Sequence, residues 1–352
     1  MESLNDKEYS LFVRFNKLED TYKIAQTRNL LRDIRIYLKH NGAAKQDGVL
    51  FYASLILEMF SIEHKNENVE EIFDYTPKLK KTYHIGKKVI EKFKSLTVED
   101  FDLYYLKIAK PALLYANTIE DAEELSKKSL KALKNLEKNE AFYNRSKFHH
   151  HLNMIERALK ADFFEVDHVN DKERSKLVKD IYEYHLKEAL QICEISDLIE
   201  EKDKVWLKIK AAIMERNSHE LTKNVDYILE KERGVATFKD MIREEVSYYS
   251  FDPGFSLNKR HFHIALGIRI RKLREIKGLR QDELSHDLNY DDITGQTVAH
   301  FEKGETSITL FKILEVASYF EVPLEKLLYG ISKLEKLNSE REYFENLLYD
   351  IA

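Results

Sequence analysis

Several residue types are scarce in this 352-residue chain, and each scarcity excludes a class of protein. The single cysteine, Cys193, rules out a disulfide framework or a thiolate metal cluster within one chain. Only four prolines and ten glycines accompany 34% charged and 43% hydrophobic residues, which favours long amphipathic helices joined by short turns. The net charge of −5 argues against a chain that coats nucleic acid over its whole surface. Any nucleic-acid contact is therefore expected to be local.

Long apolar runs are missing as well. The most apolar stretch, residues 49–60, is well short of the roughly 20 residues that a membrane span needs, and it contains Glu58. The first ten residues, MESLNDKEYS, lack the basic and apolar regions of a secretion signal. We therefore expect a cytoplasmic protein with no membrane contact.

Catalytic, cofactor and metal sites are not indicated either. The sequence has no glycine-rich phosphate loop, no nucleophile elbow and no paired His-Glu motif. The consecutive histidines 149–151 diverge by about 100° per residue on a helix, so they cannot converge on one ion; a half-buried helix face is the simpler interpretation. His261 and His263 have no carboxylate or cysteine at ligand spacing. The sequence thus predicts no enzyme, no cofactor and no bound metal.

Glycine and proline mark where the chain changes character. Six of the ten glycines follow residue 250, and residues 250–260 combine Asp-Pro-Gly turn chemistry with a loss of helical periodicity. We predict an all-α protein with a helical array over residues 1–250 and a linker over 251–263. A compact unit over 264–330 and an amphipathic tail helix over 331–352 follow.

The predicted array consists of helix-sized segments in sequence-adjacent pairs. Two segments open with a Thr-x-x-Asp capping pattern, at Thr97 and at Thr118. Paired helices of about 40 residues stack into α-solenoids. The array resembles tetratricopeptide helices in its ladder of small residues, which are Ala122, Ser126, Ser129 and Ala132. An irregular helical bundle without repeats remains the alternative.

The compact unit has the pattern of a small five-helix core. Gly278 and Gly304 stand where the first and third predicted helices end, and a residue without Cβ readily takes the left-handed conformation there. The apolar residues recur at spacings of three and four. They are Ile270, Leu273, Ile276, Leu284, Leu288, Val298, Phe301, Ile313, Leu314, Ala317, Val322 and Leu327.

Two stretches of this unit carry a family resemblance. LGIRIRKLREIKGLRQDELSHDLN matches the first two helices of the Xre/Cro helix-turn-helix family. ITGQTVAHFEKGETSITLFKILEVASYFEVPLEKLLYG matches the recognition helix of that family, its Glu-x-Gly end, and helices four and five. The unit therefore resembles lambda-type repressors, which implies a domain that binds double-stranded DNA.

The resemblance also implies site residues. Thr294 can cap the third helix, so that its first turns project toward base edges in the major groove. The base-reading candidates are Gly295, Gln296, Thr297 and His300. Gln296 is the strongest, because a carboxamide can pair with adenine N6 and N7 together. The phosphate-contacting candidates are Arg280, Gln281, Thr294, Lys303 and Thr306. Solvated helix residues remain the alternative interpretation of Gln296 and His300.

The charge of the unit predicts how it binds. Residues 264–330 hold nine Lys or Arg against eleven Asp or Glu, with Asp291 and Asp292 in an enlarged turn, whereas residues 268–280 hold six basic residues and one acidic residue. We expect modest, strongly salt-dependent affinity that relies on two copies, and hence a homodimer. The dimer surface is either the N-terminal array or an apolar stripe on the tail, formed by Ile331, Leu334, Leu337, Phe344, Leu347 and Leu348.

The array in front of this unit has three interpretations. It resembles the peptide-regulated Rap, PlcR and NprR group, which implies a quorum-sensing peptide receptor that controls DNA binding, although the helix-turn-helix comes last here. Alternatively, the array sequesters a protein, and the helix-turn-helix serves as a tether or dimer clamp. In the third interpretation the array only holds the dimer together.

Overall fold

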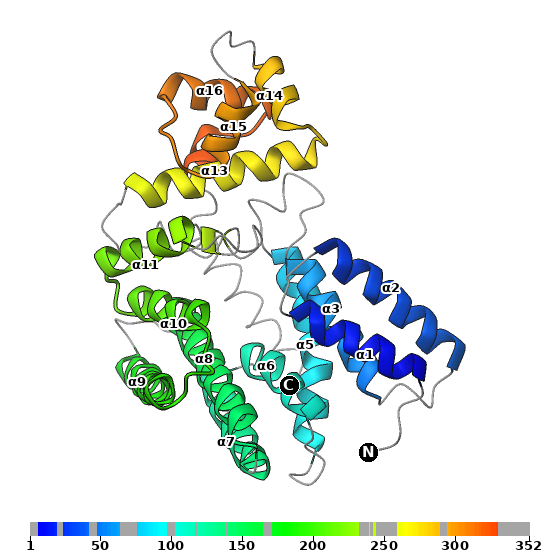
Figure 1. The fold of residues 1–352 in the computed structure, drawn as a ribbon. Helices are drawn as coiled ribbons and strands as arrows, with labels where there is room; N and C mark the ends of the chain where they lie inside the picture. Colours follow the sequence, from blue (N-terminus) through cyan, green and yellow to red (C-terminus); the bar gives the residue numbers. More distant parts are fainter. Residues whose placement is uncertain are drawn as a thin grey trace. The chain divides into compact units, whose positions relative to one another are not determined.

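A computed structural model describes most of the chain as helices (Figure 1). The described residues are 6–19, 24–41, 48–63, 76–96, 103–116, 118–137, 139–164, 171–231, 239, 242–243, 259–288 and 294–329. Within these ranges there are helices and no strands, so the all-α prediction is confirmed. None of the helices in these ranges is both long and apolar enough to cross a membrane.

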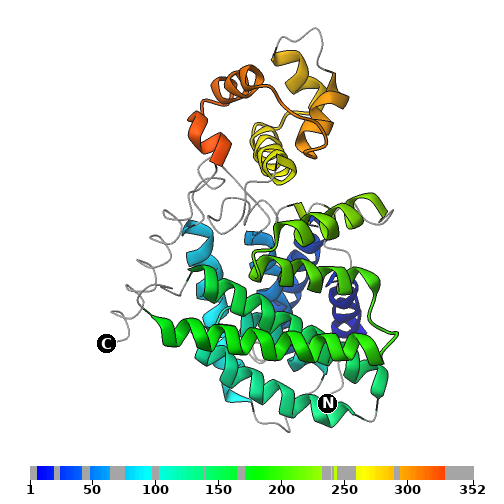
Figure 2. The same ribbon diagram turned by 90° about the vertical axis from the view of Figure 1, so that its left-hand side faces the viewer.

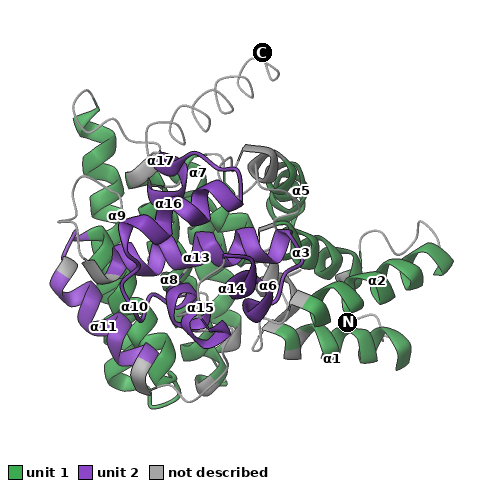
Figure 3. Cartoon of the chain, turned by 90° about the horizontal axis from the view of Figure 1, so that it is seen from above, with its two compact units in different colours: residues 1–64, 80–214 green, residues 65–79, 215–352 purple. Residues whose placement is uncertain are grey.

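The chain divides into two compact units, which Figure 3 colours separately. The first contains residues 1–64 and 80–214. Its helices are α1 (Asp6–Glu19), α2 (Ile24–Asn41), α3 (Val49–Glu63), α5 (Thr76–Ser95, from Lys80 onward), α6 (Leu103–Leu114), α7 (Ile119–Leu133), α8 (Glu140–Phe164), α9 (Lys172–Ile195) and α10 (Glu201–Met214).

Several successive helices of the first unit pack against one another. One buried cluster joins α1, α2 and α3 through side chains that include Phe15 and Ile34. Farther along, α8 lies side by side with α9 and also packs against α7 (Figures 1 and 2). The predicted cap of α7 is confirmed, since Thr118 Oγ1 accepts a hydrogen bond from the Asp121 N–H at 3.1 Å. The cap predicted at Thr97 lies outside the described residues.

Three histidines meet where α8 and α9 pack. His150 and His151 are both buried while their neighbour His149 is partly exposed, so this face is more deeply buried than the half-buried face that was expected. His151 Nδ1 lies 2.7 Å from His185 Nδ1, and His150 Nε2 lies 2.9 Å from Ser126 Oγ. Adjacent helix residues can both be buried here because α7 and α9 flank α8. One ring of the His151–His185 pair must donate and the other accept, so at least one of them is neutral.

Burial lowers the pKa of His150 to about 3, with His185 and Lys147 adding to the effect. Burial likewise lowers the pKa of His185 to about 4. The unfolded chain binds protons near the ordinary pKa of about 6.5, so the stabilisation is complete above that pH. It is lost as the pH falls from there toward the folded values. We expect each buried histidine to cost about 1.4 kcal/mol of unfolding free energy per pH unit in this window.

Chemical denaturation measured from pH 8 to pH 5 checks this expectation, with fluorescence of Trp206, the only tryptophan, reporting on the first unit. His150→Gln should reduce the pH slope, because glutamine can bond Ser126 without titrating. His84→Gln changes an exposed histidine of the same unit and should leave the slope unchanged. Equal slopes in all three proteins would contradict the role given to the buried cluster.

The second compact unit contains residues 65–79 and 215–352. Its helices are α11 (Ser218–Lys231), α13 (Lys259–Ile276), α14 (Gln281–Asp287), α15 (Gly295–Glu302), α16 (Leu310–Tyr319) and α17 (Leu324–Tyr329). The helix α13 begins five residues before the predicted start at Ile264. This early turn is anchored, since His261 is buried and its Nε2 lies 3.3 Å from Thr222 Oγ1 of α11.

A single buried cluster joins α13 to α17. Its buried residues are Leu266, Ile270, Leu273, Leu284, Val298, Ile308, Ile313, Val316, Ala317, Phe320, Val322 and Leu327. The prediction that Leu314 belongs to this core is wrong, because Leu314 is 44% exposed. The helix α16 buries residues 313, 316 and 317, followed by Phe320 just after its end, and position 314 falls beside that face. The predicted tail helix over residues 331–352 lies outside the described residues.

Candidate DNA-binding site

Two helix ends fix the recognition helix α15. Thr294 caps its start as predicted, and Thr294 Oγ1 accepts from the Thr297 N–H at 3.3 Å. Gly304 ends it with φ at 67°, and Gly278 ends α13 with φ at 71°, so both left-handed glycines are confirmed. The backbone of α15 passes very close to α13, where a Cβ built on Gly267 would overlap the carbonyl oxygen of Phe301. The cap at Thr294, the turn at Gly304 and the close approach to α13 therefore fix the position of α15.

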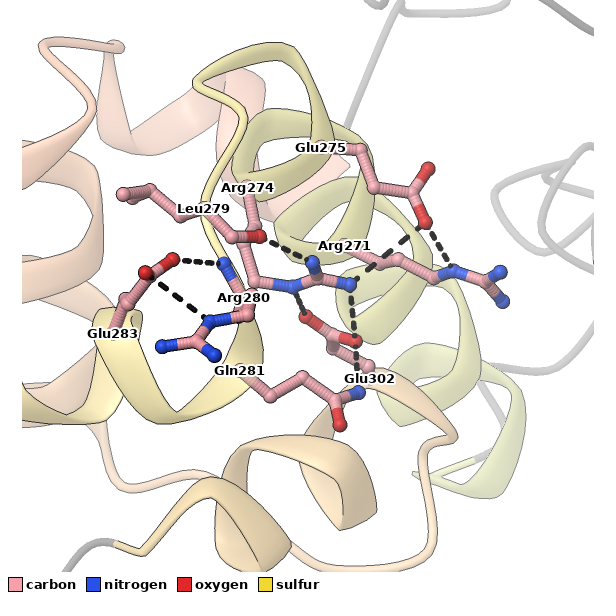
Figure 4. Close-up of polar contacts among 8 residues, drawn as sticks. All are labelled: Arg271, Arg274, Glu275, Leu279, Arg280, Gln281, Glu283 and Glu302. Carbon is pink, nitrogen blue, oxygen red and sulfur yellow. Dashed lines mark hydrogen bonds and ion pairs between the residues drawn. The ribbon is translucent and has the colours of Figure 1, made fainter.

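A buried ion pair ties α13 to the end of α15 (Figure 4). Arg274 donates to Glu302 through Nε at 2.5 Å and through Nη2 at 3.1 Å. Arg274 Nη1 donates to the carbonyl oxygen of Leu279 at 2.7 Å. The Gln281 carboxamide, at the start of α14, donates to the same Glu302 carboxylate at 2.8 Å. These contacts lock the first three helices of the domain to one another, which a rigid recognition helix requires.

Sequence reasoning missed this ion pair, although the spacing contained a signal. Glu302 follows Val298 by four residues, and Arg274 follows Ile270 by four, so each charge lies on a buried helix face. A charged residue at such a position needs an opposite partner, because an unpaired buried charge is costly. The partners are 28 residues apart in the chain, and helical periodicity does not relate residues on different helices.

The predicted base-reading residues lie on the first turns of α15. Gln296 is exposed, and Gly295, Thr297 and His300 are partly exposed. Gln296 and His300 are four residues apart and therefore share one face. The Thr297 hydroxyl also accepts a hydrogen bond from the Thr294 N–H at 3.4 Å. An accessible carboxamide, an imidazole and a hydroxyl are thus presented on a short, fixed helix.

The predicted phosphate contacts come from several elements around α15. Arg280, Lys303, Thr294 and Thr306 are exposed. Gln281 is only partly exposed, and its bond to Glu302 occupies one of its two N–H donors. The Arg280 guanidinium is paired with Glu283 at 3.1 Å, while Glu283 also accepts from the Arg280 backbone N–H at 2.7 Å. These residues surround the exposed turns of α15, and their contacts with DNA stay predictions.

The basic stretch over residues 268–280 is largely committed to contacts inside the protein. Arg269 donates to the carbonyl oxygens of Leu327 and Leu328 at 3.1 Å each. Arg271 is paired with Glu275, and Lys277 donates to the carbonyl oxygen of Tyr319. Arg274 and Arg280 are paired with Glu302 and Glu283, so these cations too have partners within the domain. The electrostatic attraction of this stretch for phosphate is therefore weaker than its composition indicates.

The five helices, the left-handed glycine turns and the exposed start of the third helix define a helix-turn-helix domain. Residues 270–327 match the family model described as Helix-turn-helix, which is the Xre/lambda repressor-like type. Comparisons of the chain with curated proteins and with solved structures gave no match. The chain thus contains a DNA-binding helix-turn-helix domain of the Xre type.

Proposed function

We propose that this protein is a sequence-specific transcriptional regulator that acts as a homodimer. In this proposal its N-terminal helices control DNA binding through a peptide or protein ligand, and the chain acts by binding rather than by catalysis. One observation gives this proposal its main support. The start of α15 is exposed, and Gln296 and its neighbours project there from a helix that the Arg274–Glu302 pair holds in place. A helix with a purely structural role would not need a first turn that is fixed in position, polar and accessible to solvent.

Selection from a randomised pool of double-stranded DNA, using the full chain, gives the preferred site and tests the proposal. In the selected site, Gln296→Ala should cost about 1 to 3 kcal/mol of binding free energy at one base position. Arg280→Ala should weaken all sequences about equally and reduce the slope of log affinity against log salt by about 1. Fluorescence anisotropy at several salt concentrations measures both effects.

Lys131→Ala is the matched control for the charge change, because Lys131 is exposed on α7 of the other compact unit. It should leave affinity and salt slope close to those of the unmodified protein. If Gln296→Ala and Arg280→Ala bind like this control, the face assigned to DNA is wrong. If the unmodified chain enriches no sequence at all, the proposal of sequence-specific binding fails.

The ligand part of the proposal is supported by exposed apolar side chains on α9. Tyr184, Leu190 and Ile195 are 51%, 44% and 67% exposed, and Leu198 just after the helix is 52% exposed. Such residues suit a protein or peptide partner. Thermal-shift screening with short peptides, followed by DNA binding with and without each hit, tests control by a ligand. Coupling requires that the ligand change the DNA affinity, and that DNA change the ligand affinity by the same factor.

The same exposed residues favour a second candidate, in which the N-terminal helices sequester a protein and the helix-turn-helix acts as a tether or clamp. A purified partner that binds the chain tightly without altering its affinity for DNA would favour sequestration. A ligand that changes DNA affinity would favour the regulator.

A further inference from the structure

The side chain of Glu305 contacts His300, one of the predicted base-reading residues. Glu305 Oε2 lies 2.6 Å from His300 Nδ1. The backbone joins the same two residues, because the Glu305 N–H donates to the carbonyl oxygen of His300 at 2.9 Å. The left-handed Gly304 makes the turn that returns Glu305 to the end of α15. Glu305 is therefore held against His300 by two contacts.

The chemistry of this pair determines which ring nitrogen of His300 is left for an outside partner. An ionised carboxylate only accepts hydrogen bonds, so Nδ1 carries the hydrogen that it donates to Glu305. The opposite nitrogen, Nε2, then remains for a ligand. The His300 and Glu305 side chains are 40% and 36% exposed, so a base edge can reach the ring. His300 also shares a face of α15 with Gln296.

We propose that Glu305 is a specificity-determining positioning residue, whose carboxylate holds His300 so that Nε2 reads one base of the DNA site. This inference rests on the proposed function, because it requires α15 to enter the major groove. Without Glu305, the neutral ring can take either tautomer and can rotate about its side-chain bonds. A base preference that depends on a fixed donor or acceptor is then lost.

A carboxylate beside DNA has a second effect of opposite sign. Its charge repels the phosphates, so removing it strengthens binding to every sequence. Glu305→Ala is therefore expected to bind all DNA more tightly while it discriminates less at one base pair. A carboxylate without a positioning role would produce tighter binding alone. A loss of selectivity at one base pair therefore distinguishes a positioning role of Glu305 from electrostatic repulsion alone.

The test compares the full-length unmodified protein with His300→Ala, Glu305→Ala and Glu305→Gln. Each selects from the same randomised pool of double-stranded DNA, and the bound fraction is sequenced. His300→Ala should flatten the preference at one base position. Glu305→Ala should reduce selectivity at that same position by about three- to ten-fold, with the position read by Gln296 unchanged. Glu305→Gln should retain most of it, because the carboxamide oxygen still accepts from Nδ1.

The double variant His300→Ala/Glu305→Ala should lose no more selectivity at that position than His300→Ala alone, since the two residues act as one unit. An unchanged preference in Glu305→Ala would overturn the inference, as would a His300→Ala variant that flattens no position. If the unmodified protein enriches no sequence, the proposed function fails instead. The two failures are therefore separate results of the same experiment.

Discussion

Replacing Glu302 with alanine should lower the unfolding free energy of the helix-turn-helix domain by about 3 to 5 kcal/mol. The side chains of Arg274 and Glu302 are only 11% and 3% exposed, so water cannot replace the lost carboxylate. The guanidinium would keep its bond to the Leu279 carbonyl oxygen and a longer 3.8 Å contact with the exposed Glu275, but it would lose its buried counter-charge. Gln281 would lose its acceptor as well. A buried, uncompensated charge is among the most destabilising results of a single substitution.

Hydrogen exchange of peptides from α13 and α15 measures this loss within the full chain, while Trp206 fluorescence reports on the other compact unit. Glu305→Ala is the matched control, because it removes the same charge from an exposed site and should change stability by less than about 0.5 kcal/mol. Replacing both partners, as in Arg274→Met/Glu302→Leu, should recover most of the lost stability. Equal protection in Glu302→Ala and Glu305→Ala would show that the pair contributes little.

Gly267→Ala is expected to cost about 3 kcal/mol of unfolding free energy through overpacking, and to weaken DNA binding too. The added Cβ would overlap the Phe301 carbonyl oxygen and lie 2.8 Å from the carbonyl oxygen of Glu302. Both neighbours are backbone atoms, which cannot rotate away as a flexible side chain could. The helix α15 would have to move off α13, taking the base-reading residues with it.

Gly278→Ala separates this packing effect from backbone strain. Gly278 has φ at 71°, but a Cβ there would meet no atom within 4 Å. Alanine should therefore cost only about 1 to 2 kcal/mol, from the left-handed conformation, and DNA affinity should be retained once the protein is folded. Chemical denaturation and anisotropy on the selected DNA site compare the two variants. A Gly267→Ala protein with unchanged DNA affinity would contradict the close approach of α15 to α13.

Local features of the fold were predictable because they depend on near neighbours in the chain. The caps at Thr118 and Thr294 and the left-handed glycines at 278 and 304 each follow from residue type within one helical turn. Leu314 was assigned wrongly because spacing alone does not decide which of two adjacent apolar residues faces the core. The side of α16 that is buried depends on how α17 and α13 pack, which is a tertiary property.

Charged and polar pairings were less predictable than the core. The base-reading candidates could be placed on α15 from the sequence pattern, but their partners could not. The contact of Glu305 with His300 depends on the turn made after Gly304. The pairing of His151 with His185 joins residues 34 apart on two helices. No periodic signal relates such positions, because each helix specifies only its own faces.

The internal partners of the α13 cations affect how the protein would find its operator. Attraction to arbitrary DNA comes from phosphates alone and grows with each counterion released. Because Arg271 and Arg274 are paired with carboxylates of the same domain, this stretch holds the protein on random sequence less strongly than its composition indicates. We expect short residence on non-target DNA and a search dominated by three-dimensional diffusion rather than sliding. In the proposed homodimer, long occupancy of the operator would then depend on both copies engaging at once.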